Sequence, residues 1–253
     1  EWSFANSSSL VLKAKIEENS LLLKNISGVN IFRGVTTGFN PAFIIDEEKK
    51  NELIRKDNRN FEIVKKLLQG RNIRKWVFNF NNEYLLFTRQ GIQIENHPTI
   101  EEHLLSYYSQ LKPRDKNDEK GRKPGLYKWF EIQDNTAYYR EFDKQKIIWG
   151  LTADKWAYAY DDNRHFLPSN GYILTSENIP VKYLLAILNS NLMKYYFGFI
   201  GVMTAGGAYT LKLSCVQELP VKIASNEKMF IVVVDEILSQ KSQGIDTTAL
   251  EQQ

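Results

Sequence analysis

Cysteine and histidine are scarce in this sequence. Cys215 is the only cysteine in 253 residues, so the chain cannot form an internal disulfide, which fits a reducing, cytoplasmic compartment. It lies in the apolar segment 211–216, where we expect a buried structural thiol. The three histidines, His97, His103 and His165, lack the spacing of metal ligands. We therefore expect no metal site.

A Gly-x-Gly motif is also missing. No two of the 14 glycines lie two positions apart, whereas a Rossmann-like cosubstrate site needs a Gly-x-Gly turn for close backbone approach. The glycines between 198 and 207 are not followed by Lys-Ser or Lys-Thr, which excludes a P-loop. No proline precedes an aspartate, so a nuclease motif that begins Pro-Asp is absent. We expect no catalytic residue in this chain.

Long hydrophobic runs are lacking too. The most apolar stretch, from Tyr183 to Phe199, is interrupted by Asn189, Ser190, Asn191 and Lys194, which favours a buried helix over a membrane span. The first residue is Glu1 and no basic-then-apolar leader follows it, so we expect no signal peptide. The chain stops in a polar sequence, and both ends suggest a piece of a longer protein.

What is present is ordinary globular composition with uneven charge. Hydrophobic residues make up 43% and charged residues 25%, enough to bury a large core. The net charge is only +3, so the sum does not indicate a polyanion partner. The distribution of charge does indicate such a partner. Residues 65–76 carry five basic side chains and no acidic one, and residues 112–128 carry seven basic and three acidic. Such runs suit phosphate contact, although a solvated face explains a single run equally well.

Polar side chains gather on a glycine-containing turn within residues 31–46. Arg33 precedes Gly34, and Thr36, Thr37 and Asn40 follow between two apolar segments. Side chains of this kind can hydrogen-bond base edges from a rigid turn. Aromatic residues near the basic runs can stack on bases but are more often core residues. Trp149 and Trp156 flank a loop at 152–155, which is a candidate to lie over a groove, whereas the two rings themselves are more often core or rim residues.

The periodicity of apolar residues predicts an α+β fold of mixed, short-stranded sheets with packed helices. Helices are expected at 8–26, 47–56, 61–68, 98–111, 180–199 and 226–241. Strands are expected at 29–35, 42–46, 129–132, 146–151, 156–161, 171–175 and 209–216, with an extended segment at 217–223. A β-hairpin is predicted from 76–80 and 84–88, and residues 112–125 read as a loop.

Several of these segments carry a resemblance in the same order. They are Arg33-Gly34 with Thr37-Gly38-Phe39-Asn40, Gly70-Arg71-Asn72-Ile73, Leu111-Lys112-Pro113-Arg114, Lys146-Ile147-Ile148, Leu185–Ser190 and Glu218-Leu219-Pro220-Val221. Together, from about Trp2 to about Leu238, the chain resembles the TaqI-like C-terminal specificity domain. That domain is the DNA target-recognition part of adenine-specific restriction–modification enzymes of the type II, IIG-like, class.

The resemblance implies an organisation and a set of partners. Residues 1–28 would form an N-terminal linker or helix, 29–225 the target recognition domain, and 226–253 a C-terminal helical part whose long closing helix starts near Thr248 and is truncated. The partner would be double-stranded DNA. An adenine-N6 methyltransferase domain using S-adenosylmethionine would precede this segment in the parent chain. Whether the parent also cleaves DNA, with Mg²⁺, stays open, and no cofactor is expected here.

Two groups of candidate DNA-binding residues follow. Basic side chains would grip phosphates and fix the register: Lys65, Lys66, Arg71, Arg74, Arg114, Lys116, Arg122 and Lys123. Loop side chains would read base edges in the major groove: Arg33, Thr36, Thr37, Asn40, Gln69, Arg71 and Arg89. Asn40-Pro41-Ala42-Phe43 lacks the second proline of an Asn-Pro-Pro-Tyr methyltransferase loop, so we do not assign Asn40 a catalytic role.

Two other classes remain open on the sequence alone. The aromatic content of 13% would suit a module that binds RNA or single strands. The apolar helix expected at 180–199 would suit a protein-interaction domain that docks on a partner. A comparison of duplex and single-strand affinity separates the first class, and weak binding to any polyanion would indicate the second.

Overall fold

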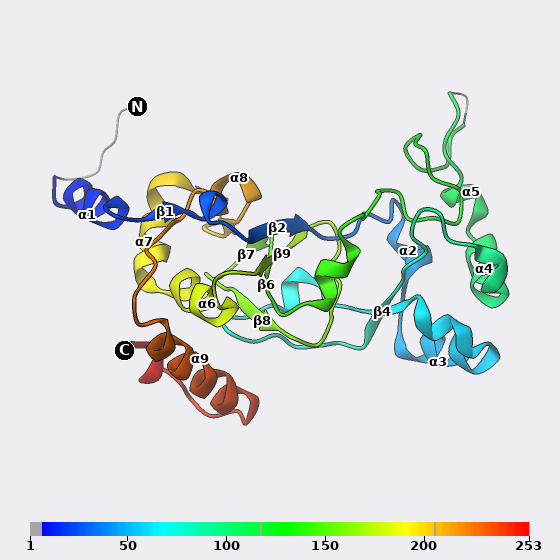
Figure 1. Cartoon of the computed structure of the whole chain (residues 1–253). Coiled ribbons are helices and arrows are strands. Elements are labelled where there is room, and N and C mark those ends of the chain that lie inside the picture. Colours follow the sequence, from blue (N-terminus) through cyan, green and yellow to red (C-terminus); the bar gives the residue numbers. More distant parts are fainter. Residues whose placement is uncertain (1–6, 117, 205, 253) are drawn as a thin grey trace.

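A four-stranded antiparallel sheet forms the centre of the molecule (Figure 1). The computed structural model describes residues 7–116, 118–204 and 206–252. The sheet has the order β2 (Val29–Arg33), β9 (Gly171–Ser176), β6 (Lys146–Gly150) and β8 (Ala159–Asp161). Its register pairs Ile31 with Leu174 and Ile147 with Leu174, so β9 is hydrogen-bonded on both sides.

Both faces of this sheet are buried, each in a different hydrophobic core. On β6, Ile147 and Trp149 belong to a C-terminal core that also contains the buried side chains of residues 181–237, whereas Ile148 belongs to an N-terminal core built mainly from residues 35–142. On β9, Leu174 belongs to the C-terminal core and Ile173 to the N-terminal core. Because side chains alternate along a strand, one sheet supports two cores.

The N-terminal core is covered by short helices and a second small sheet, at the right of Figure 1. The sheet has the order β3 (Ile44–Ile45), β5 (Glu83–Leu86), β4 (Val64–Leu67), and all its pairs are antiparallel. The α-helices are α2 (Asn40–Phe43), α3 (Glu47–Lys56), α4 (Pro98–Leu105) and α5 (Tyr108–Leu111). The 3₁₀ turns here are η2 (Asn58–Glu62), η3 (Gly70–Asn72), η4 (Ile94–Asn96) and η5 (Tyr139–Asp143).

The C-terminal core is covered by longer helices. They are α6 (Val181–Asn189), α7 (Asn191–Ile200), α8 (Leu213–Val216) and α9 (Glu227–Ser242), with α1 (Ser7–Glu17) beyond them and the 3₁₀ turns η1 (Leu23–Asn25) and η6 (Leu250–Gln252). Strand β1 (Leu21–Leu22) pairs with β12 (Pro220–Val221). A three-stranded sheet has the order β10 (Val202–Met203), β11 (Tyr209–Thr210), β7 (Thr152–Ala153).

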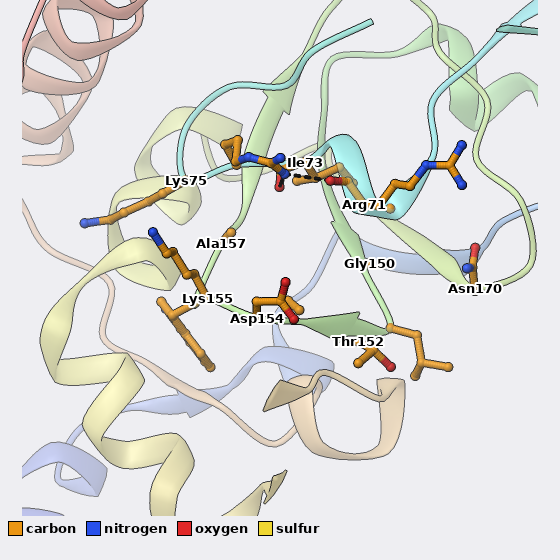
Figure 2. A pocket seen from close by; sticks show the side chains of 14 residues that line it. Arg71, Ile73, Lys75, Gly150, Thr152, Asp154, Lys155, Ala157 and Asn170 are labelled. Atoms are coloured by element: carbon orange, nitrogen blue, oxygen red, sulfur yellow. Dashed lines mark hydrogen bonds between the residues drawn. The ribbon is translucent and has the colours of Figure 1, made fainter. Parts of the chain in front are cut away.

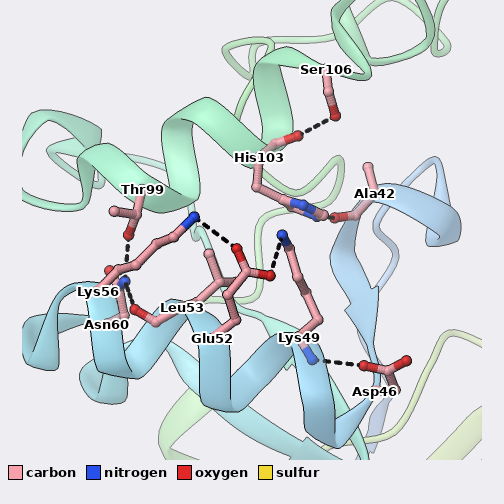
Figure 3. A network of polar contacts seen from close by, with 10 residues as sticks. All are labelled: Ala42, Asp46, Lys49, Glu52, Leu53, Lys56, Asn60, Thr99, His103 and Ser106. Carbon is pink, nitrogen blue, oxygen red and sulfur yellow. Dashed lines mark hydrogen bonds and ion pairs between the residues drawn. The ribbon is translucent and has the colours of Figure 1, made fainter.

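Polar contacts join the short helices at this end: Asn60 links α3 to α4, and His103 links α4 to α2 (Figure 3). Asn60 donates to Leu53 O at 2.8 Å and to Thr99 Oγ1 at 2.7 Å, and its Oδ1 lies 3.2 Å from His97 Nδ1. The Nε2 atom of His103 lies 3.0 Å from Ala42 O. Burial lowers the pKa of both histidines, which therefore act as neutral structural groups.

The same end of the molecule shows why α3 begins and ends where the sequence predicts. The Asp46 carboxylate accepts from Lys49 N at 2.8 Å and so caps the helix, and basic residues occupy the last turn. On the exposed face of α3, hydrogen bonds from Lys56 and Lys49 lower the pKa of Glu52 to about 2 (Figure 3). The cap, the charges at the helix ends and the apolar periodicity therefore all predict the same bounds for α3.

The α+β class is confirmed, but several predicted elements are wrong. The helix expected at 61–68 does not form: residues 61–62 end η2, and Val64–Leu67 form strand β4, which pairs with β5. The hairpin 76–88 does not form, since Phe78 pairs with Ile73 and β5 pairs with β3 and β4. Residues 129–132 form no strand, and the predicted helix 8–26 ends at Glu17. The first six residues of the predicted segment 1–28 lie outside the described part.

Two further predictions fail at polar side chains. The helix expected at 180–199 is two helices, because Ser190 accepts from Met193 N at 3.1 Å and starts α7. Asn189, the last residue of α6, holds the backbone of Tyr158, donating to its O at 2.9 Å. The strand expected at 209–216 ends at Thr210, and Cys215 lies half-buried in α8.

Candidate nucleic-acid interface

A groove of about 620 Å³ opens beside the central sheet (Figure 2). One wall is the turn at residues 70–75 and the other is the segment 150–157 that follows β6, with Asn170 at one end. We call it the central groove. Its basic lining residues are Arg71, Arg74, Lys75 and Lys155. The basic run at 65–76 and the loop between Trp149 and Trp156, distant in sequence, therefore line one surface.

Two glycines bring the walls of the central groove together. A Cβ atom on Gly150 would lie 3.2 Å from the Cα of Gly70, and one on Gly70 would lie 3.1 Å from the Cα of Gly150. No side chain fits at this crossing without displacing the opposite backbone. The crossing fixes the position of η3, and with it Arg71, relative to the end of β6.

Trp76 holds the other end of the basic turn. Its φ is 76°, in the left-handed region that bulky residues rarely adopt. The backbone around it is fixed, because Trp76 N donates to Tyr158 O at 2.8 Å and Tyr160 N donates to Trp76 O at 3.1 Å. Its side chain is buried in the C-terminal core. The turn that carries Arg74 and Lys75 is thus anchored at a strained but well-supported residue.

The basic side chains of the central groove differ in how strongly hydrogen bonds and ion pairs within the protein engage them. Arg71 has a side chain 70% exposed and lies 3.3 Å from Glu83 Oε1, a solvent-screened pair. Arg74 donates to Arg71 O at 2.6 Å and to Ile73 O at 3.0 Å, which folds it over the turn. Lys75 pairs with Glu251 at 2.7 Å. Lys155 is exposed and has no ion pair within the described residues.

Arg33 and Gln69 lie close to this groove. Arg33 ends β2, is exposed, and donates from Nε to Ser169 O at 2.6 Å, next to the groove residue Asn170. Gly34 leaves room for this contact, since a Cβ there would lie 2.1 Å from Pro168 O. Gln69 is half-buried immediately before η3. The structure therefore brings Arg33, Gln69, Arg71 and Arg74 into one neighbourhood.

Arg122 is buried and its predicted role as a phosphate contact is wrong. Its five N–H groups are taken up by backbone carbonyls: Nε by Leu111, Nη1 by Thr37 and Glu131, and Nη2 by Lys128 and Trp129. Only 3% of the residue is exposed, and burial lowers its pKa to about 10, so it stays charged at neutral pH.

Thr37 is also buried, which contradicts its predicted role in base reading. Its hydroxyl donates to Asn40 Oδ1 at 2.7 Å and its carbonyl accepts from Arg122. Both groups are engaged in holding the turn. The turn at 36–40 and the base of the loop at 112–125 are therefore packed together through Arg122.

The other predicted residues lie outside the central groove. Arg114, Lys116 and Lys123 are exposed on the loop after α5, at the opposite end of the molecule from α9 (Figure 1). Half-buried Thr36 and exposed Asn40 lie at the base of that loop. Lys65 and Lys66 belong to β4, and the Arg89 guanidinium lies 5.4 Å from the ring centre of Tyr139. The basic side chains thus form two surfaces rather than one.

Comparisons with known proteins show the family to which the chain belongs. A family model described as "TaqI-like C-terminal specificity domain" matches residues 65–221, well over half of the chain. The chain belongs to this family. The TaqI-like specificity domains are the specificity domains of restriction–modification enzymes, which implies recognition of a DNA sequence. No curated protein matches the chain in sequence.

Two solved structures share the fold of this TaqI-like specificity domain. One is the type IIG restriction endonuclease BpuSI, with a TM-score of 0.54, 15% identity, and coverage of 91% of this chain and 28% of that chain. The other is the type IIL restriction–modification enzyme MmeI in complex with DNA, with a TM-score of 0.57, 15% identity, and coverage of 88% and 29%. The chain spans less than a third of either enzyme.

Sequence reasoning missed several residues of the central groove in this specificity domain. Thr152, Asp154, Lys155 and Asn170 line it but belong to no basic run. The one sequence feature that marked residues 152–155 was the pair of tryptophans that flank them. Trp149 donates to Leu211 O at 3.1 Å and Trp156 to Leu188 O, at 2.6 Å, so both rings anchor the segment in the C-terminal core.

A buried ionic group joins two neighbouring strands of the central sheet. Lys146, on β6, and Asp161, on β8, are both fully buried and lie 2.5 Å apart, and Asp161 also lies 2.9 Å from His165 Nδ1. Although burial alone would raise it, the hydrogen bond from His165 and the charge of Lys146 hold the pKa of Asp161 at about 2. The group is out of reach of a substrate, so it is structural.

The described residues offer neither a membrane-spanning helix nor a metal cluster. No helix is long and apolar enough to cross a membrane. No cluster of three or more His, Cys, Asp or Glu side chains in that part of the chain could hold a metal ion.

Proposed function

We propose that this domain binds double-stranded DNA, recognises a base sequence, and so positions DNA for a restriction–modification enzyme. One observation carries the proposal: exposed Arg71 stands at a cation-lined groove in a member of a specificity-domain family. Arginine pairs well with guanine in the major groove, and lysines suit phosphates. The neighbour MmeI is itself described in complex with DNA, which supports a duplex as the ligand.

The second basic surface, Arg114, Lys116 and Lys123, would hold phosphates away from the central groove. Contacts of this kind fix register and make binding depend on salt. Lys65, Lys66 and Arg89 would extend them. The parent enzyme would carry an adenine-N6 methyltransferase domain that uses S-adenosylmethionine, together with Mg²⁺ if it also cleaves. This domain would then clamp the duplex while the adenine is turned out of it.

The two alternative classes have less support. Trp76 and Tyr127, next to the basic runs, are buried and cannot stack on bases, so Tyr108 is left as an exposed ring beside these runs. The apolar face of α6 packs in the C-terminal core of its own chain. A docking role for that helix would require it to leave this core.

Fluorescence anisotropy with labelled duplex and single-stranded DNA of random sequence tests the proposal. We expect duplex binding that weakens as salt rises, and weaker single-strand binding. Arg71→Ala should lower duplex affinity by about 1–3 kcal/mol if Arg71 reads a base, or reduce the salt slope by about 1 if it contacts a phosphate. Arg55→Ala, at an exposed arginine of α3, is the control. No duplex binding at low salt would contradict the proposal.

A further inference from the structure

One acidic side chain lies in the lining of the central groove among four basic ones. Asp154 is exposed, and within the described residues no hydrogen bond or ion pair engages its carboxylate. In Figure 2, Lys75 and Lys155 lie at one end of the groove, Arg71 and Asn170 lie at the other, and Asp154 lies between them, directed toward the wall formed by residues 70–75.

This carboxylate opposes the general attraction of the groove for a polyanion. At a surface site two like charges a few ångströms apart repel, so a phosphate near Asp154 is disfavoured. An ionised carboxylate only accepts hydrogen bonds, whereas the arginine and lysine side chains around it only donate them. Asp154 therefore supplies the one type of hydrogen bond that the basic side chains of the groove cannot make.

The segment that carries Asp154 is braced on both sides. Leu151 N donates to Asn170 O at 2.7 Å, and Leu211 N donates to Leu151 O at 2.7 Å. Strand β7 then pairs with β11, with Thr152 opposite Thr210 and Ala153 opposite Tyr209. The backbone up to Asp154 is thus fixed relative to the central sheet. A polar group held this way can discriminate between ligands, because it cannot retreat from an unsuitable one.

We propose that Asp154 is a specificity-determining residue that accepts a hydrogen bond from the exocyclic amino group of a cytosine or an adenine in the major groove. Cytosine presents its N4 amino group there and adenine its N6 amino group, whereas guanine and thymine present carbonyl oxygens at the equivalent place. Those oxygens would face the carboxylate without a proton between them. The inference rests on the function proposed above, since it requires that a duplex lies in the central groove.

Selection from a randomised duplex library, followed by sequencing, tests the inference on this chain. The wild type should select a sequence in which one position is restricted to cytosine or adenine. Asp154→Ala should select the same sequence with that position relaxed, with discrimination there falling by between about fivefold and about a hundredfold. The identity of the restricted base decides between cytosine and adenine.

Two further variants separate base reading from charge. Glu95→Ala removes an exposed carboxylate outside the groove lining and should leave the selected sequence unchanged. Asp154→Asn removes the charge but keeps an acceptor and adds donors, so it should change the preferred base rather than abolish the preference. If Asp154→Ala selects the wild-type sequence at every position, the inference is overturned while DNA recognition stands. If the wild type itself selects no sequence, the proposed function fails, and the inference with it.

Discussion

The guanidinium of Arg122 joins three segments of the chain through five backbone carbonyls. Truncation to alanine would leave these carbonyls buried without donors, so we expect Arg122→Ala to lower the free energy of unfolding by about 3–5 kcal/mol. Lys123→Ala, at the exposed neighbour, should change it by less than about 0.5 kcal/mol. Urea denaturation measures both. Equal stability of the two variants would contradict the structural role of Arg122.

Asp161 gives a second prediction at this scale. Asp161→Asn leaves Lys146 buried without a counter-charge, and we expect a loss of about 3–5 kcal/mol in unfolding free energy. Adding Lys146→Met should recover part of this loss, because the unpaired charge is then gone. Thermal or urea unfolding of the single and double variants tests the coupling, which is absent if their effects simply add.

The pKa of Asp161 also predicts a pH dependence. The pKa is about 2 in the folded protein, below its ordinary value of 3.8, so the folded state favours the ionised form. This stabilisation is complete above about pH 4 and is lost as the pH falls toward 2. The Asp161→Asn variant should therefore lose less stability than the wild type over that range, as urea titrations at successive pH values would show.

At the scale of elements, the crossing of Gly70 and Gly150 sets the width of the central groove. Gly150→Ala would place a Cβ 3.2 Å from the Cα of Gly70. We expect a loss of about 1–3 kcal/mol in stability and weaker duplex binding, because the turn that carries Arg71 must move. Gly198→Ala is the contrasting variant, since a Cβ there meets no atom within 4 Å and Gly198 lies within helix α7.

Gly198→Ala should raise the free energy of unfolding by up to about 1 kcal/mol, because alanine is the better helix former. Duplex affinity should not change. Denaturation and anisotropy measurements on the two glycine variants check both effects together. A Gly150→Ala variant as stable as the wild type would mean that the two backbones do not lie this close.

Some helices and strands could be predicted from the sequence, and others could not. Helix α3 was predictable because its cap at Asp46, its charges and its apolar spacing agree locally. Strand β4 was not, because Val64–Leu67 becomes a strand only by pairing with β5, about twenty residues away, and short apolar runs are ambiguous without that partner. Helix 180–199 was predicted at the right place, and the break at Ser190 was missed because a cap inside an apolar run resembles an exposed polar residue.

Part of the site was predictable, because some of its residues form patterns that are local in the sequence. The run at 65–76 marked Arg71 and Arg74 because charge clusters are visible locally. Arg122 looked like its neighbours in the loop, and only the carbonyls of Thr37, Leu111 and residues 128–131, which converge on it in the fold, make it a buried residue. Asp154 had only the two flanking tryptophans as a signal and Asn170 had none, because the backbone pairing that brings them to the groove leaves no local pattern.

At the scale of the whole molecule, one sheet joins two cores. Ile147 and Ile148 are adjacent on β6 and face the C-terminal and N-terminal cores respectively. Since neither core can lose the sheet without exposing the other, we expect one cooperative unfolding transition, with coincident curves from tryptophan fluorescence and far-UV circular dichroism. Ile147→Ala and Ile148→Ala should each lower its stability by about 2–5 kcal/mol. Two separate transitions, each sensitive to one variant, would show that the cores unfold independently.

Because the central sheet is covered on both faces, the polar side chains of the central groove lie outside its four strands. Thr152, Asp154 and Asn170 are solvent-accessible, and their replacement removes nothing from either core. On the function proposed here, they form a small set of positions whose residues can be substituted without loss of the fold. Combinatorial libraries confined to them could generate altered target preferences on an unchanged scaffold.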